Sequence, residues 1–139
     1  MTQTLETLRV LIVDDIEGER LLIRDMLQEI GFRNISEADD GATAIEMIGQ
    51  GAFQLVVSDF RMPKVSGSDL LSFVRKHRDM CMTPFVMVTA QTDAIPLRSA
   101  IAPNRTAWLY KPLGFGVFKT TVLSLMKRWY QIEQAPVMN

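Results

Sequence analysis

The stretch LVVSDFRMP, residues 55–63, decides how the chain folds. Its apolar residues 55–57 lead through Ser58 to Asp59, and the turn-forming Pro63 follows shortly after. A short apolar run bounded by a turn signal is typical of a buried β-strand. In an open α/β sheet, ligands bind beyond the carboxyl ends of the strands, which is where Asp59 would lie. A carboxylate buried there is costly unless it is paired, so we expect other functional side chains to converge on Asp59.

The length and composition predict a single domain. The chain has 139 residues, of which 47% are apolar, enough for a sizeable core. No apolar run approaches the roughly 18 residues of a membrane span, and the N-terminus lacks a signal-peptide pattern. A net charge of -1 gives no general attraction to nucleic acid. The single cysteine, Cys81, cannot form an internal disulfide, which fits a reducing cytoplasm.

Strand patterns and helix patterns alternate along the chain. Five strands are predicted, at residues 8–13, 34–38, 55–59, 85–89 and 107–110. Five helices are predicted, at residues 22–30, 40–49, from 66 onward, 92–102 and 115–129. This alternation predicts an α/β fold, a flavodoxin-like doubly wound parallel sheet of order 2-1-3-4-5. The basic run at residues 75–78 is expected at a solvated helix end.

The predicted strand order brings acidic side chains together. Strands one and three are neighbours, so Asp14 and Asp15 would share one crevice with Asp59. Carboxylates in one pocket repel each other, and Mg²⁺, which prefers oxygen ligands, would relieve that repulsion. Thr89 and Lys111, at the ends of strands four and five, would add a hydroxyl and an ammonium group. Such a set suits a phosphoryl group, and aspartate is a nucleophile that forms aspartyl phosphates.

With these residues in order, each at a strand end, the chain resembles a response-regulator receiver domain of two-component signalling, most like the stand-alone chemotaxis receivers. The resemblance rests on Asp14-Asp15, on Asp59 with its downstream Met62-Pro63 and Gly67, on Thr89, and on Lys111-Pro112. It implies a single receiver domain over residues 1–139, with its core at about 8–131 and a tail at 132–139. The alternative is a receiver excised from a longer regulator.

The resemblance also implies a role for each matched residue. Asp59 would be the phosphoacceptor, and Lys111 would pair with a phosphoryl oxygen. Asp14, Asp15, Asp59 and the backbone carbonyl of Arg61 would hold Mg²⁺. The peptide bond before Pro112 would be cis.

A conformational switch is implied as well. Thr89 would move to bind the phosphoryl group, and Trp108 would rotate into the vacated space; the alternative is that Trp108 only packs. Tyr110 is expected on the opposite face of the strand. Arg61 and Gln91, each two residues beyond a key position, would modulate the lifetime of the phosphoryl group; the alternative for Arg61 is a solvent-exposed side chain.

The implied partners are proteins of a phosphorelay. A histidine kinase or phosphotransfer protein would donate the phosphoryl group. An output protein would dock on the face formed by helix four, strand five and helix five, and a phosphorylation-dependent dimer is left open. The domain would phosphorylate and dephosphorylate itself without turning over an external product, so we do not expect a conventional enzyme.

Two alternatives share the architecture. A metal-dependent phosphatase of the haloacid-dehalogenase type usually carries Asp-x-Asp after strand one, where this chain has Asp15-Ile16-Glu17. A flavodoxin needs a hydroxyl-rich phosphate loop at the same place, and Asp14-Asp15 would repel the flavin phosphate. Both alternatives therefore fit the first strand end poorly.

Overall fold

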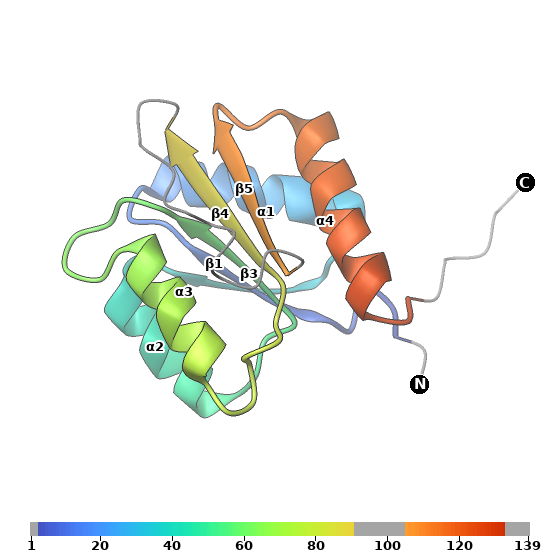
Figure 1. Ribbon diagram of the computed structural model, residues 1–139. Helices are drawn as coiled ribbons and strands as arrows, with labels where there is room; N and C mark the ends of the chain where they lie inside the picture. Colours follow the sequence, from blue (N-terminus) through green and yellow to red (C-terminus); the bar gives the residue numbers. More distant parts are fainter. Residues whose placement is uncertain (1–2, 91–104, 133–139) are drawn as a thin grey trace, which may run out of the picture.

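The computed structural model describes residues 3–90 and 105–132, and within them a five-stranded parallel sheet forms the centre of the molecule (Figure 1). The strands are β1 (Arg9–Val13), β2 (Asn34–Ala38), β3 (Leu55–Asp59), β4 (Phe85–Ala90) and β5 (Thr106–Lys111). Their order is β2-β1-β3-β4-β5, which confirms the predicted topology. The flavodoxin-like arrangement follows directly from the alternating strand and helix patterns.

Four helices of the described residues cover the two faces of the sheet. They are α1 (Glu17–Ile30), α2 (Gly41–Gln50), α3 (Gly67–Lys76) and α4 (Phe115–Trp129). Helices α1 and α4 lie together on one face, and α2 and α3 lie on the other (Figure 1). The helix predicted over residues 92–102 lies outside the described residues, as does Gln91. None of the four helices is long and apolar enough to cross a membrane.

The core is two apolar layers separated by the sheet. Successive strand residues point to opposite faces, so alternate residues of one strand enter different layers. In β3, Leu55 and Val57 pack on the side of α1 and α4, whereas Val56 packs on the side of α2 and α3. Every residue of β3 is buried. The strand that carries Asp59 is therefore the most enclosed strand of the sheet.

Local capping signals in the sequence correctly place the starts of α2 and α3, whereas α1, predicted from residue 22, begins at Glu17. The Asp40 side chain accepts a hydrogen bond from the Thr43 backbone N–H at 2.7 Å, which caps α2. Ser66 and Asp69 form a reciprocal capping box at the start of α3. Such a box satisfies backbone N–H groups that a helix leaves unpaired. Because α3 starts just beyond Asp59, this cap also fixes the loop that leaves β3.

The expectation that the basic run at residues 75–78 is a solvated helix end is wrong for Arg75. Its guanidinium group donates to the backbone carbonyls of Thr83 at 2.6 Å and Arg105 at 3.0 Å, and to Thr106 Oγ1 at 2.8 Å. Burial lowers the pKa of Arg75 to about 10. Arginine offers five N–H donors in a fixed fork, and here that fork ties α3 to the segments that begin β4 and β5.

Gly67 is required by close packing beneath the site. A Cβ there would lie 2.3 Å from the Asp59 carbonyl oxygen and 2.6 Å from Met87 Sδ. We predict that Gly67→Ala lowers the free energy of unfolding by about 1–3 kcal/mol, because the added methyl group overpacks the core. Gly49→Ala is the matched control, because a Cβ at Gly49 meets nothing within 4 Å. Thermal unfolding measures both; an unchanged midpoint for Gly67→Ala would contradict the packing.

Candidate functional site

Three carboxylates meet at the carboxyl ends of β1 and β3. Asp14 and Asp15 follow β1 directly, and Asp59 is the last residue of β3. The two strands pair in parallel, with Val13 opposite Ser58, so their ends lie side by side. One carboxylate oxygen from each of the three residues lies within 4.8 Å of the others. Asp14 is fully buried, Asp59 is 6% exposed and Asp15 is exposed, so the cluster opens to solvent on one side.

Lys111 brings a positive charge to this cluster from the end of β5. Its Nζ lies 3.0 Å from Asp59 Oδ1 and 3.8 Å from Asp14 Oδ2. It also lies 2.5 Å from Glu19 Oε2, on the first turn of α1. The peptide bond between Lys111 and Pro112 is cis, as the resemblance implied. The predicted convergence of Asp14, Asp15, Asp59 and Lys111 is therefore present in the structure.

The two buried acids of the cluster are electrostatically strained. The pKa of Asp14 is raised to about 7, mainly by burial. The hydrogen bond from the Ile16 backbone N–H acts to lower this pKa, whereas Glu19 and Asp59 act to raise it. Burial also raises the pKa of Asp59, although its hydrogen bond with Lys111 opposes the change. For Lys111, burial acts to lower the pKa, but its hydrogen bonds with Glu19 and Asp59 outweigh burial and raise it. The site therefore carries more negative charge than Lys111 compensates.

These residues fit a divalent cation. Asp14 Oδ2 is buried and receives no hydrogen bond from any residue that the structure describes. A buried carboxylate oxygen without a donor is costly, and a metal ion is one of the few groups that can satisfy it. Oxygen ligands from carboxylates are those that Mg²⁺ prefers. Asp14, Asp15 and Asp59 are thus an oxygen donor set that could hold Mg²⁺.

The predicted switch residues lie next to the cluster. Asp59 pairs with Val88 of β4, so Thr89 is the next residue toward the carboxyl edge of the sheet. Thr89 is buried. Trp108 pairs with Met87, and its ring lies 5.7 Å from the ring of Phe60, the residue after Asp59. The Trp108 Nε1–H is buried and has no hydrogen-bond partner among residues 3–90 and 105–132. A short row of side chains therefore leads from Asp59 to Trp108.

The expected orientation of Tyr110 is wrong. Tyr110 and Trp108 are two residues apart in β5, and side chains with that spacing point to the same face of a strand. Tyr110 lies nearer the carboxyl end, where it is 46% exposed. It is therefore a surface residue beside the switch rather than a packing residue on the far side.

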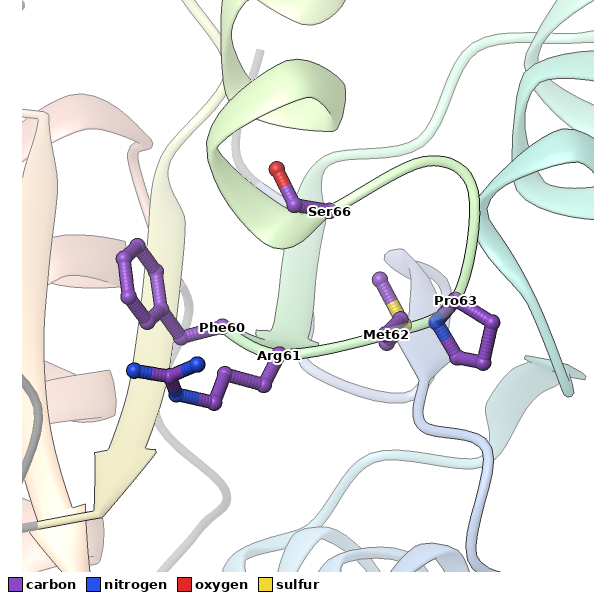
Figure 2. Close-up of a pocket in the computed structure, with 5 residues that line it drawn as sticks. All are labelled: Phe60, Arg61, Met62, Pro63 and Ser66. Carbon is purple, nitrogen blue, oxygen red and sulfur yellow. The ribbon is translucent and has the colours of Figure 1, made fainter.

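Arg61 lies on the loop after β3, at the rim of the site. Together with Phe60, Met62, Pro63 and Ser66 it lines an open pocket of about 650 Å³. Figure 2 shows the Arg61 side chain extending alongside Phe60, whereas Met62 and Pro63 lie farther along the loop. Arg61 is exposed, so its guanidinium group is accessible to molecules that approach the site.

Glu19 is the site residue that the sequence interpretation missed. Asp14, Asp59 and Lys111 were predicted because each lies at the end of a strand. Glu19 lies in the first turn of a helix, where acidic residues are common because they interact favourably with the helix dipole. A signal was present in retrospect. Asp14 to Glu19 span the loop and first turn after β1, so a long side chain at residue 19 can reach back over the carboxyl edge of the sheet.

The acidic cluster and its facing lysine lie where the strand order of the doubly wound sheet reverses, between β1 and β3. This arrangement defines a class of α/β proteins that bind a metal ion and a phosphoryl group at the strand ends. The chain belongs to the response regulator receiver domain family, whose pattern it matches over residues 10–123. It is a receiver domain of a two-component response regulator. Members of this family are signalling proteins rather than conventional enzymes, which sets aside the phosphatase and flavodoxin alternatives.

Curated relatives and solved structures agree with this assignment. The chain is 35% identical over 121 residues to the chemotaxis protein CheY of Pseudomonas aeruginosa, covering 87% of this chain and 98% of that protein. Chemotaxis protein CheY-3 of Vibrio cholerae is 32% identical over 123 residues, covering 88% and 95%. The structure of Vibrio cholerae CheY4 superposes with a TM-score of 0.73 at 28% identity, covering 85% and 98%. A receiver domain of a histidine kinase from Syntrophus aciditrophicus shares the fold, with a TM-score of 0.76 at 21% identity, covering 94% and 98%.

The strain at Asp14 predicts a distinctive effect of Asp14→Asn. A carboxyl group whose pKa is raised by folding costs stability as the pH rises from about 4 to about 7, because the native state binds the extra proton. In EDTA at pH 8, Asp14→Asn should therefore stabilise the protein by an amount on the order of 2 kcal/mol, and the gain should shrink toward pH 4. The same variant should lose stabilisation by added Mg²⁺.

Thermal unfolding at several pH values measures this effect. Asp25→Asn is the matched control, because Asp25 is an exposed acid of α1 remote from the cluster, and it should change neither quantity. Equal unfolding midpoints for Asp14→Asn and the wild type at pH 8 would show that Asp14 is not strained.

Proposed function

We propose that this chain is a phosphoacceptor in a two-component phosphorelay and takes its phosphoryl group on Asp59. The observation that carries the proposal is the 3.0 Å approach of Lys111 Nζ to Asp59 Oδ1 beside two further carboxylates. An ammonium group so placed can pair with a phosphoryl oxygen, and the family match points to the same chemistry. The donor would be a phosphohistidine of a histidine kinase or a phosphotransfer protein.

The transfer needs one nucleophile and one leaving group. A carboxylate oxygen of Asp59 attacks the phosphorus atom, a bond from oxygen to phosphorus forms, and the bond from phosphorus to the histidine nitrogen of the donor breaks. Water later attacks the same phosphorus atom and releases inorganic phosphate, which restores the Asp59 carboxylate. The chain itself supplies the acceptor, its orientation at the end of β3 and the ammonium group of Lys111.

Asp14, Asp15, Asp59 and the Arg61 backbone carbonyl would hold Mg²⁺, which would neutralise charge on the phosphoryl oxygens. The buried Asp14 Oδ2, which has no hydrogen-bond donor within the described residues, supports this assignment. With Mg²⁺ bound, Lys111 would keep its contact with Asp59. Arg61 and Gln91 would modulate the lifetime of the phosphoryl group, Arg61 through a guanidinium fork that can fold over it.

The signal would pass from Asp59 through Thr89 to Trp108. A phosphoryl group adds strong hydrogen-bond acceptors and about -1.5 to -2 units of charge. Thr89 directly follows Val88, the residue that pairs with Asp59 in the sheet, and its hydroxyl would turn toward that group. Trp108 would then move inward. Its buried indole N–H, which no described residue accepts, supports the proposal, because a second position with a partner would relieve that cost.

The output would be a docking event on a partner protein, through a face expected to comprise β5, α4 and the helix that the sequence predicts at residues 92–102. Dimerisation on phosphorylation is a second form that this output can take. We place the relay in the cytoplasm, because a single cysteine leaves the chain without an internal disulfide.

Asp59→Asn should abolish phosphorylation by acetyl phosphate in the presence of Mg²⁺. The substitution keeps the shape of the side chain and removes the nucleophilic carboxylate. Intact-mass spectrometry should show one added phosphoryl group on the wild type and on the control Asp25→Asn, and none on Asp59→Asn. Phosphorylation of Asp59→Asn at the wild-type level would place the acceptor elsewhere.

Trp108 should report the switch directly. Trp129 is the second tryptophan, so Trp129→Phe leaves Trp108 as the only indole. In that background, beryllofluoride with Mg²⁺ should change the tryptophan fluorescence, and Thr89→Ala should remove most of the change. A signal of the same size in the Thr89→Ala variant would contradict the coupling between Thr89 and Trp108.

A further inference from the structure

Glu19 makes a closer contact with Lys111 than Asp59 does, yet the proposed phosphoryl transfer does not use it. The Lys111 ammonium lies 2.5 Å from Glu19 Oε2 and 3.0 Å from Asp59 Oδ1. Both side chains of the Lys111–Glu19 pair are partly shielded from solvent, with 24% and 35% of their surface exposed. The group expected to bind the phosphoryl oxygens is therefore already engaged by a second acid.

Helix capping does not account for the position of Glu19. Ile16 is the residue that precedes α1, and Glu19 is the third residue of the helix. A glutamate at this third position commonly accepts a hydrogen bond from the backbone N–H of the residue that precedes the helix. In this chain the Ile16 N–H donates instead to Asp14 Oδ1, at 2.9 Å. The Glu19 carboxylate is thus displaced from its usual capping position and reaches over the sheet edge to Lys111.

The first turn of α1 is also held in place. Arg20 donates to the backbone carbonyl of Asp14 at 2.7 Å and pairs with Glu37 of β2 at 3.3 Å. These contacts fix the residue next to Glu19 against both β1 and β2. The Glu19 carboxylate therefore starts from an anchored backbone, which keeps it beside Lys111.

We propose that Glu19 is a positioning residue that competes with the phosphoryl group for Lys111 and so disfavours phosphorylation of Asp59. The inference rests on the proposed function and deepens it. In the unphosphorylated protein Glu19 holds the ammonium group toward α1. When Asp59 is phosphorylated, Lys111 turns to the new oxygens and releases Glu19.

Charge and donor geometry support this competition. A lysine ammonium has three N–H donors, and here two of its acceptors are the carboxylates of Glu19 and Asp59. A phosphoryl group adds acceptors and negative charge next to Asp59. Glu19 carries the same sign of charge as the phosphoryl group, so it opposes that group both by repulsion and by occupying Lys111. The release of Glu19 would also make the start of α1 sensitive to phosphorylation.

The test compares Glu19→Gln with Glu17→Gln in the full chain. Both glutamates lie in the first turn of α1, so both variants remove one charge from the same helix end, but Glu17 is exposed and does not approach Lys111. The measured quantity is the affinity for beryllofluoride at saturating Mg²⁺, followed by fluorine NMR. We expect Glu19→Gln to bind about two- to fivefold more tightly than the wild type, the size of a partly exposed ion pair. Glu17→Gln should match the wild type.

Three results would overturn the proposal. Equal affinities for Glu19→Gln and Glu17→Gln would show that the contact with Lys111 has no effect on the phosphorylated state. Weaker binding by Glu19→Gln would show that Glu19 supports Lys111 instead of competing for it. Wild-type protein that neither binds beryllofluoride nor accepts phosphate from acetyl phosphate would overturn the proposed function and this inference with it, so the two failures are distinguishable.

Discussion

The crowding of carboxylates at the ends of β1 and β3 is the constraint on which the rest of the structure depends. Asp14, Asp15 and Asp59 come within 4.8 Å of one another, and the Lys111 ammonium group offsets only part of their charge. Burial raises the pKa of Asp14 to about 7, a sign that the folded chain holds this group at a cost. Such a cost persists where the surrounding structure over-determines the geometry. Here the buried strand β3 and the close contact of Gly67 with the Asp59 carbonyl provide that rigidity.

The same imbalance explains how a small chemical change can act over a distance. A site that is short of positive charge responds strongly to a divalent cation and to a new phosphoryl group, because each changes the charge by more than one unit. Lys111 already has alternative partners in Glu19 and Asp59, so its hydrogen bonds can be redistributed without unfolding any element. Within the described part of the chain, the buried N–H of the neighbouring Trp108 has no acceptor, and the proposed movement would let it gain one. Asp14 and Trp108, the residue proposed to switch, share one property: each has a buried polar atom without a hydrogen-bond partner among the described residues.

The fold and the strand-end residues were predictable because they follow from one-dimensional patterns. Alternating strand and helix signals determine the sheet order, and the sheet order places Asp14 beside Asp59. Glu19 and Arg75 were not predictable in this way. Both lie on helices, where a charged residue usually faces solvent. The Lys111 partner of Glu19 is 92 residues away in sequence, and the Thr106 partner of Arg75 is 31 residues away. The wrong prediction for Tyr110 was avoidable, because residues two apart in a strand, such as Trp108 and Tyr110, point to the same face.

The most direct test of the account is a crystal structure of the protein with Mg²⁺ and beryllofluoride. The account predicts the metal among the carboxylates of Asp14, Asp15 and Asp59, beryllium on an Asp59 oxygen, and Lys111 within hydrogen-bonding distance of a fluoride. A metal bound away from these three acids, or a Lys111 side chain directed away from Asp59, would contradict it.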